Sequence, residues 1–205
     1  MRRVLFVLAA LVAVVSASSL RLERPLYIGT TDELIQYDDG TAYWLTWGGL
    51  YRGVWYSSDD FAPGASFSAE NMELWFYHHA SYPWDTGSFY AELYTGDAAG
   101  PVTQLDQTSV TAAHYAPCYA NYSSPIDCGT NWWGLINTEM SAGGWPSVLG
   151  DNTPNSTDHS FFSDDFVVWE PWIISGSTAN DYFVRFNGQF GLESETWGAI
   201  KGLYQ

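Results

Sequence analysis

The sequence predicts an all-β fold, namely an antiparallel β-sandwich with a jelly-roll-like arrangement of strands. Short runs of β-branched and aromatic residues alternate with clusters of Gly, Pro, Asn, Asp and Ser, which is the pattern of strands and turns. No helical period persists for three turns, whereas a parallel α/β sheet would need helices between its strands. Many short strands with frequent turns therefore favour a sandwich or jelly roll.

The strands are expected where apolar positions recur at a spacing of two. In segments 70–78 and 88–94, apolar side chains alternate with glutamate and aromatic side chains, so each segment is expected to form a half-buried antiparallel strand. The turn-rich segment 81–87 between them favours a hairpin. Further strands are expected at residues 51–56, 102–110, 132–136, 166–174, 181–186 and 197–203.

Segment 141–160 shows no alternation and contains many turn-forming residues. We expect it to be a long loop. Long ordered loops on a rigid sheet often carry binding functions, but a variable loop without a function has the same sequence pattern.

The N-terminus predicts export from the cytoplasm. Arg2 and Arg3 precede an apolar run of secretory length, and small residues end that run at position 17. Residues 1–17 are therefore expected to be a signal peptide and residues 18–205 a single β-sandwich domain in a secreted or cell-surface protein. The alternative is a retained anchor, although the run is shorter than the roughly 20 residues that span a bilayer. No later segment is apolar enough to span a membrane.

The charge of the chain argues against two classes of partner. The net charge is −16, and cleavage of the signal peptide would remove two of the seven basic residues. Binding to nucleic acid or to anionic lipid normally depends on clustered Lys and Arg, so neither partner is expected.

Cys118 and Cys128 are the only cysteines in the chain. In an oxidising compartment a pair is expected to form a disulfide, which would close a short loop of about ten residues. A metal site on the same pair would need further ligands at a suitable spacing.

A pair of carboxylates could support glycoside hydrolysis, which needs one acid and one base or nucleophile. Six glutamates are available, at positions 70, 73, 92, 139, 193 and 195. Glu73 and Glu92 fall on the two strands of the expected hairpin and share its outward phase with aromatic residues, so they are the catalytic candidates. The same alternation is also typical of any solvated sheet face.

Calcium is the cofactor that the residue types allow, because oxygen ligands are abundant and the extracellular compartment is rich in calcium. The candidate ligands are pairs of neighbouring aspartates, although aspartate-rich turns form without a metal as well. These candidates are Asp38, Asp39, Asp59, Asp60, Asp164 and Asp165.

Asn121 and Asn155 each begin an N-glycosylation sequon, and both are expected to lie in loops of an exported chain.

The chain contains 11 tryptophans, which is more than a core of this size needs. Exposed aromatic rings stack on sugars and on other flat partners, and they commonly mark interfaces. The alternative is that the rings pack under loops. The candidate binding residues are Trp84, Trp132, Trp133, Trp145, Trp172 and Tyr90.

Residues Tyr37–Tyr56, with the sequence YDDGTAYWLTWGGLYRGVWY, resemble the start of β-sandwich modules in secreted bacterial surface proteins. The resemblance covers about a tenth of the chain. It implies a β-sandwich at the cell surface, with a role in adhesion, carbohydrate binding or surface assembly.

Three functions follow as hypotheses. The first is a non-enzymatic binding or adhesion module whose exposed aromatic residues bind an extracellular glycan or a cell-surface protein. The second is a structural subunit that assembles with copies of itself into a filament, sheath or layer. The third is a small glycoside hydrolase that uses Glu73 and Glu92.

Overall fold

The computed structural model describes residues 19–21, 34–153, 158–174 and 180–191. These residues form antiparallel sheets and one 3-10 turn, η1 (Ser58–Asp60), so the expected all-β class is confirmed. The signal peptide expected at residues 1–17 and the strand expected at 197–203 lie outside the described residues. The described part of the chain contains no helix with the length and apolar character that crossing a bilayer requires.

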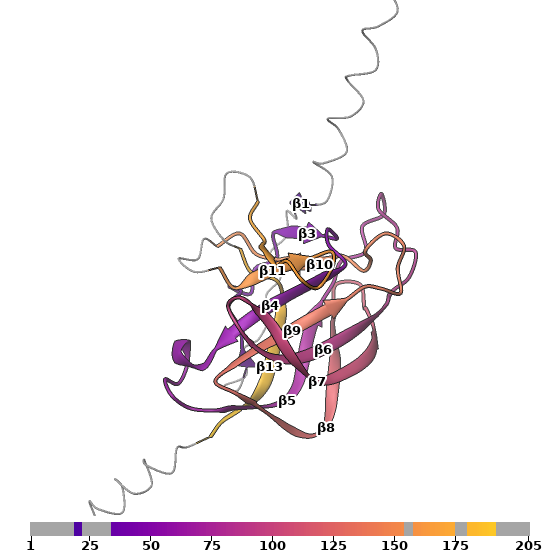
Figure 1. Ribbon diagram of the computed structural model, residues 1–205. Coiled ribbons are helices and arrows are strands. Elements are labelled where there is room, and N and C mark those ends of the chain that lie inside the picture. The colour runs from indigo at the N-terminus through magenta and orange to yellow at the C-terminus, as the bar shows by residue number, and fades with distance from the viewer. Residues whose placement is uncertain (1–18, 22–33, 154–157, 175–179, 192–205) are drawn as a thin grey trace, which may run out of the picture.

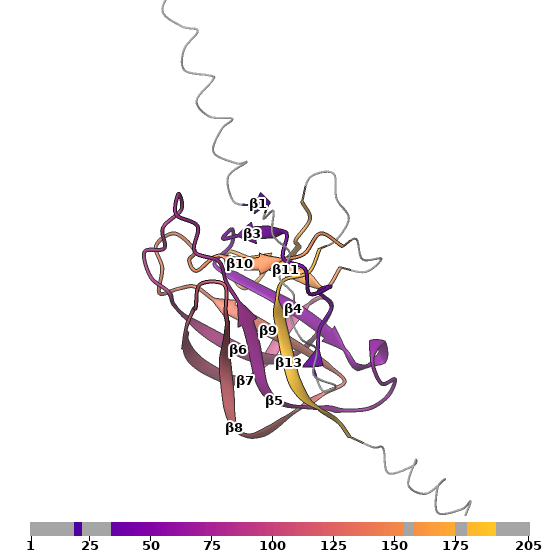
Figure 2. The ribbon, with the colours of Figure 1, turned by 180° about the vertical axis from the view of Figure 1, so that it is seen from behind.

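The strands form three sheets, which Figures 1 and 2 show from opposite sides. The six-stranded sheet has the order β12 (Glu170–Pro171), β11 (Ser160–Ser163), β4 (Tyr51–Ser57), β9 (Asn131–Asn137), β6 (Ser88–Asp97) and β7 (Gly100–Thr111). The four-stranded sheet has the order β2 (Leu34–Ile35), β13 (Val184–Phe190), β5 (Phe67–Trp75) and β8 (Pro117–Gly129). The three-stranded sheet has the order β1 (Ser19–Arg21), β3 (Trp44–Thr46) and β10 (Val148–Gly150).

The six-stranded and four-stranded sheets share one hydrophobic core. Leu93 of β6 and Trp132 of β9 lie in the same buried cluster as Met72 of β5 and Phe186 of β13. The Tyr56 hydroxyl of β4 donates a hydrogen bond across this core to the Val184 carbonyl of β13. Figures 1 and 2 accordingly show β4, β9 and β6 in one layer and β13, β5 and β8 in another.

The alternation predicted the strands well where one face is apolar. Segments 51–56, 70–78, 88–94, 102–110 and 132–136 all lie largely within strands, and segment 181–186 overlaps β13. The strand expected at 166–174 is wrong, since only β12 forms there. The long loop expected at 141–160 is mostly confirmed, although it contains β10.

The hairpin expected between segments 70–78 and 88–94 is wrong. β5 belongs to the four-stranded sheet and β6 to the six-stranded sheet, so segment 76–87 crosses from one sheet to the other. Both strands bury an apolar face in the shared core, and for that reason their alternation looked like that of strands in one sheet.

The expected disulfide is also wrong, because Cys118 and Cys128 are both free and buried. The segment between them is not a loop but the body of β8, whose register pairs Cys118 with Leu74 and Gly129 with Phe67 of β5. Leu74 and Phe67 are seven residues apart on β5, so at about 3.3 Å per residue the two ends of this pairing, with the cysteines, lie roughly 20 Å apart. A disulfide needs Cα atoms within about 7 Å. Burial raises the pKa of each thiol to about 12, so both are neutral at physiological pH.

Candidate functional site

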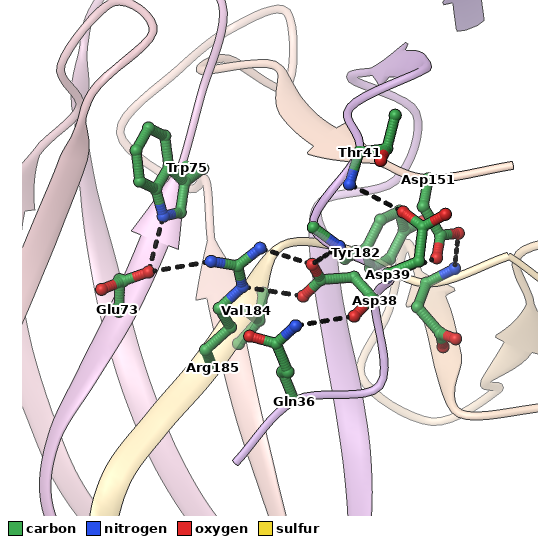
Figure 3. Close-up of polar contacts among 12 residues, drawn as sticks. Gln36, Asp38, Asp39, Thr41, Glu73, Trp75, Asp151, Tyr182, Val184 and Arg185 are labelled. Carbon is green, nitrogen blue, oxygen red and sulfur yellow. Dashed lines mark hydrogen bonds and ion pairs between the residues drawn. The ribbon is translucent and has the colours of Figure 1, made fainter. Parts of the chain in front are cut away.

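Glu73 and Glu92, the expected catalytic pair, lie in different sheets and are not neighbours. Glu73 is buried at only 7% exposure and serves an ion-pair network. Its carboxylate accepts hydrogen bonds from Trp75 Nε1 at 2.7 Å and Arg185 Nη1 at 3.2 Å (Figure 3). The Tyr119 hydroxyl donates a third, at 3.1 Å. These partners hold the Glu73 carboxylate within the framework of the four-stranded sheet.

Asp38 is the second acid on the same arginine. Its two carboxylate oxygens accept hydrogen bonds from Nε and Nη2 of Arg185, and both side chains are fully buried (Figure 3). Burial disfavours the charged guanidinium, but the ion pairs with Asp38 and Glu73 outweigh that effect and raise the pKa of Arg185. This cluster joins the segment before β3 to β13 and β5.

The aspartates considered for calcium do not converge on a site. Within residues 19–21, 34–153, 158–174 and 180–191, no group of three or more His, Cys, Asp or Glu side chains is placed to hold a metal ion. Asp39 and Asp165 accept hydrogen bonds from backbone amides two residues further along the chain, and Asp59 accepts one from Gly64. Asp60 accepts one from the Tyr37 hydroxyl. These acids stabilise turns and loop contacts.

Three of the tryptophans considered for binding are core residues, so their expected exposure is wrong. Trp132 is fully buried and stacks on Tyr56 and Phe67, with ring centroids 5.4 and 4.6 Å apart. Trp133 is fully buried on the opposite face of β9. Trp172 is 5% exposed and stacks on Tyr182. Flanking Gly, Pro and Asn residues did not indicate exposure, because Trp132 and Trp133 lie within β9 and pack against residues of neighbouring strands.

Trp84 and Trp145 are half-buried and lie at one end of the molecule, where loops from both sheets meet. Trp145 stacks on Trp47 at 4.9 Å, and Trp47 in turn contacts Tyr82 at 5.0 Å. We call Tyr82, Trp47 and Trp145 the aromatic row. Trp84 donates from Nε1 to Ser147 Oγ at 2.9 Å and packs against the core, so it supports this end of the molecule from below.

A pocket of about 320 Å³ adjoins the aromatic row, and we call it the Trp47 pocket. A ring, a carboxylate and several glycine backbone groups share its lining. The lining residues are Trp47, Gly49, Leu50, Ser141, Ala142, Gly143, Gly144 and Asp164. Gly49 and Gly144 have φ of 82° and 75°, a backbone region in which a side chain is strained, so glycine is needed at both turns.

Two polar side chains hold the loops around the pocket in place. Asp85 accepts hydrogen bonds from Ser141 Oγ at 2.7 Å and from the Ala142 amide at 2.8 Å. Arg52 is fully buried beneath the pocket and donates to the carbonyls of Thr46, at 3.0 Å, and Gly144, at 2.7 Å. Burial lowers the pKa of Arg52 to about 10, which still leaves it charged at neutral pH. The pocket therefore has a preformed wall.

Glu92 is close to another glutamate, Glu139, which follows β9. Asn137 Nδ2 donates to Glu92 Oε1 at 2.9 Å and lies 3.4 Å from Glu139 Oε2. Gln107 Nε2 donates to the same Glu92 oxygen at 2.7 Å, and the Tyr51 hydroxyl donates to Glu139 Oε1 at 2.7 Å. We call Glu92 and Glu139 the carboxylate pair.

Strand register explains why these side chains meet. Tyr90 of β6 lies directly opposite Asn137 of β9, which lies opposite Tyr51 of β4. Glu92 follows Tyr90 by two residues and so points to the same face of the six-stranded sheet, away from the shared core. The Trp47 pocket is nearby, because its lining residues Leu50, Ser141 and Asp164 come one or two positions from Tyr51, Glu139 and Phe166 in the chain.

Two tyrosines beside the carboxylate pair have raised pKa values. Burial and then the hydrogen bond to Glu139 raise the pKa of Tyr51. Burial and then the charge of Glu92 raise the pKa of Tyr94 to about 12. Both phenols therefore remain protonated at physiological pH and act as hydrogen-bond donors rather than as bases.

Sequence reasoning placed Glu92 and Tyr90 on this face but missed their partners. Glu139 was one of six candidate glutamates. The sequence feature that could have pointed to it is its position two residues after Asn137, at the end of a strand. Trp47 and Tyr51 flank the Gly-Gly turn at 48–49. Their proximity to Glu139 depends on the pairing of β4 with β9, which no local pattern indicates.

The structure describes the asparagine of one of the two sequons. Asn121 lies exposed within β8, opposite Asn71 of β5, and not in the expected loop. Asn155 lies outside the described residues.

No protein-family model matches the chain, and no curated protein or solved structure matches it either.

Proposed function

We propose that this is a secreted extracellular protein that binds a saccharide at the Trp47 pocket and along the adjoining face of the six-stranded sheet. The observation that carries the proposal is the aromatic row beside a pocket that is also lined by a carboxylate and by glycine-rich loops. The finer fold assignment, a jelly-roll-like β-sandwich, belongs to the same proposal. It is supported by the core that the two larger sheets share.

The chemistry of a sugar suits this lining. A pyranose ring offers an apolar C–H face that stacks on an aromatic side chain, and its hydroxyl groups need donors and acceptors at the edge. Trp47 supplies a ring, Asp164 supplies an acceptor, and the glycine loops supply backbone groups. Trp145 stacks on Trp47 and Tyr82 contacts it at a tilt, and these two contacts restrict the orientation of the Trp47 ring. The cost of ordering the ring on binding is therefore small.

Location outside the cell is proposed from the N-terminal signal pattern and from the resemblance of residues 37–56 to secreted bacterial surface modules. A surface without clustered basic residues is in keeping with this location. Glycan attachment at Asn121 remains part of the proposal, and the exposure of that side chain supports it.

The test is binding of soluble oligosaccharides to the mature protein, by glycan array followed by calorimetry. Trp47→Ala should weaken binding at least tenfold, because one stacking contact contributes about 1 to 3 kcal/mol when a flat ring is lost. Tyr119→Ala is the matched control, since Tyr119 is 43% exposed but lies on β8 of the other sheet. Equal loss in both variants, or no oligosaccharide bound by the wild type, would refute the proposal.

Self-assembly is a second candidate, favoured by one observation. Val102, Val167 and Val168 are 76%, 79% and 58% exposed, and they flank the contact between Gly100 and the Trp169 ring. Exposed apolar groups close together commonly mark contacts between proteins. Light scattering across protein concentration tests this candidate, and a monomer at every concentration would exclude it.

A further inference from the structure

The two acids of the carboxylate pair are close enough for the class of glycosidase that works with the shorter separation. Glu92 Oε1 and Glu139 Oε2 lie 2.9 and 3.4 Å from the same amide nitrogen of Asn137, so the two oxygens are at most about 6 Å apart. Retaining enzymes hold their carboxyl groups about 5 to 5.5 Å apart, whereas inverting enzymes need about 6.5 to 9.5 Å to admit a water molecule. The geometry fits the first class.

Glu92 is held in an unusual state for a buried acid. The side chain is 2% exposed, and its Oε1 accepts two amide hydrogen bonds while its Oε2 has no hydrogen-bond partner. A buried polar atom without a partner costs about 1 to 3 kcal/mol, and more when it carries charge. Such an atom calls for an explanation beyond stability. The amide hydrogen bonds fix Oε1, whereas Oε2 makes no hydrogen bond of ordinary length, although the Glu92 carboxylate also interacts with the Tyr94 hydroxyl.

Glu139 differs in each of these respects. It is exposed, and the Tyr51 hydroxyl donates to its Oε1. A residue that exchanges protons with a leaving group and then with water must reach solvent, and Glu139 does. The different surroundings therefore give the two acids different roles.

Phe166 packs beside the carboxylate pair. Its ring contacts Tyr51 at 4.9 Å and Tyr94 at 5.3 Å, the two tyrosines beside the carboxylate pair. The Phe166 segment is held by local hydrogen bonds from backbone amides to Ser163 and Asp165, and not by a strand partner. Movement of this ring would break no strand pairing, so we expect Phe166 to control access to Glu92.

We propose that the carboxylate pair hydrolyses a glycosidic bond with retention of configuration, with Glu92 as nucleophile and Glu139 as general acid and base. In the first step Glu92 Oε2 bonds to the anomeric carbon, the glycosidic C–O bond breaks, and protonated Glu139 gives its proton to the departing oxygen. In the second step Glu139 takes a proton from water, the water oxygen bonds to the anomeric carbon, and Glu92 leaves as a carboxylate. This inference extends the proposed saccharide binding to its reaction.

The test uses the mature protein and cyclitol epoxides configured as common hexoses and pentoses, which alkylate the nucleophile of retaining glycosidases. Peptide mass mapping should locate the label on Glu92, and Glu92→Gln should abolish labelling. Phe166→Ala should accelerate labelling at least threefold, because the ring no longer covers the acid. Glu70→Gln is the matched control, since Glu70 is exposed on β5 of the other sheet, and this variant should label like the wild type.

Aryl glycosides of the sugar that labels best separate the two roles. Glu139→Gln should lose about 10²- to 10⁴-fold in rate with a poor leaving group, where proton transfer is needed, and much less in glycosylation with dinitrophenolate. Added azide should yield a glycosyl azide of retained configuration from Glu139→Ala. A structural role for Glu139 would instead lower both rates equally.

The wild-type outcome decides the inference. Absence of labelling by every epoxide, together with no reducing ends released from any bound oligosaccharide, would overturn it. The proposed binding function would then stand alone if Trp47-dependent binding persists. Glu92→Gln should be at least as stable as the wild type in thermal unfolding, because it removes a buried charge with an unpaired oxygen. A marked loss of stability would assign Glu92 to the framework and also count against catalysis.

Discussion

Buried charge is the main feature of this protein at the scale of single residues. Arg185 holds Asp38 and Glu73, which come from segments 147 and 112 residues away in the chain. Removing one member of such a cluster leaves an uncompensated charge in the core. Asp38 and Glu73 have the sequence character of surface residues, but their ion pairs with Arg185 make them buried parts of the framework.

Asp151 makes the stability of the fold depend on pH. Its carboxylate is fully buried and accepts hydrogen bonds from the backbone amides of Asp39, at 3.1 Å, and Asp181, at 2.9 Å (Figure 3). Burial raises the pKa of Asp151 to about 7, against about 3.9 in an unfolded chain. The folded state therefore keeps a proton between roughly pH 4 and 7 that the unfolded chain has released.

We expect protonated Asp151 to contribute to the free energy of unfolding fully below about pH 4, and this contribution to be lost as pH rises to about 7. The loss is at most roughly 4 kcal/mol. Urea unfolding at pH 4, 5.5, 7 and 8 should show that Asp151→Asn removes this part of the slope, whereas Glu70→Gln should not. Parallel pH profiles for Asp151→Asn and the wild type would contradict the assignment.

At the scale of elements, β8 shows how a sequence pattern can mislead. Ser, Pro and Asn between the two cysteines suggested a loop, yet this stretch pairs with β5 along a 13-residue strand. Register shifts in that pairing, between Phe67 and Ser68 and between Ala69 and Asn71, accommodate the residues that do not fit a regular strand.

The packing distance between the two larger sheets is set in part by Gly134 of β9. A Cβ atom there would lie 2.9 Å from atoms of Phe186 and Val184 on β13. Gly134→Ala should destabilise the fold by about 1 to 3 kcal/mol, because both sheets would have to shift. The control is Gly87→Ala, whose new Cβ would meet no atom closer than 3.7 Å. Similar denaturation midpoints for both variants would show that the two sheets can shift to accommodate the added methyl group without loss of stability.

At the scale of the whole molecule, the described surface carries acids and no exposed Lys or Arg. Arg52 and Arg185 are the basic residues whose side chains the structure describes, and both are fully buried. Carboxylates such as Asp85, Glu139 and Asp164 lie at or near the Trp47 pocket. The field at this site therefore favours a neutral or cationic ligand over an anionic one.

Sulfated and uronate polysaccharides should consequently not bind, even at low ionic strength. Any neutral saccharide that binds should do so with an affinity that changes less than twofold between 50 and 500 mM salt, because little charge is neutralised on binding. A polymer with free amines should bind more weakly as salt rises. Calorimetry at the two salt concentrations measures both effects, and tight binding of a sulfated polymer would contradict this view of the surface.

The sequence by itself determined the all-β class and most strand positions, because alternation with a period of two and the turn-forming residues are local properties. It also determined the acidity of the surface, since so few basic residues exist to offset the carboxylates. Glu92 and Tyr90 were placed together for the same local reason, as residues two apart on one strand.

Only the tertiary structure decided which strands are neighbours, and every other feature of the site depends on that choice. The pairing of β6 and β4 with β9 brings Glu139 to Glu92 and Tyr51 to Glu139, whereas Glu73 joins Arg185 in the other sheet. The burial of Trp132 and Trp133 and the separation of the two cysteines follow from the same pairings. Strand order depends on how segments that are distant in the chain pack together. The free energy of that packing cannot be inferred from a local pattern of residues.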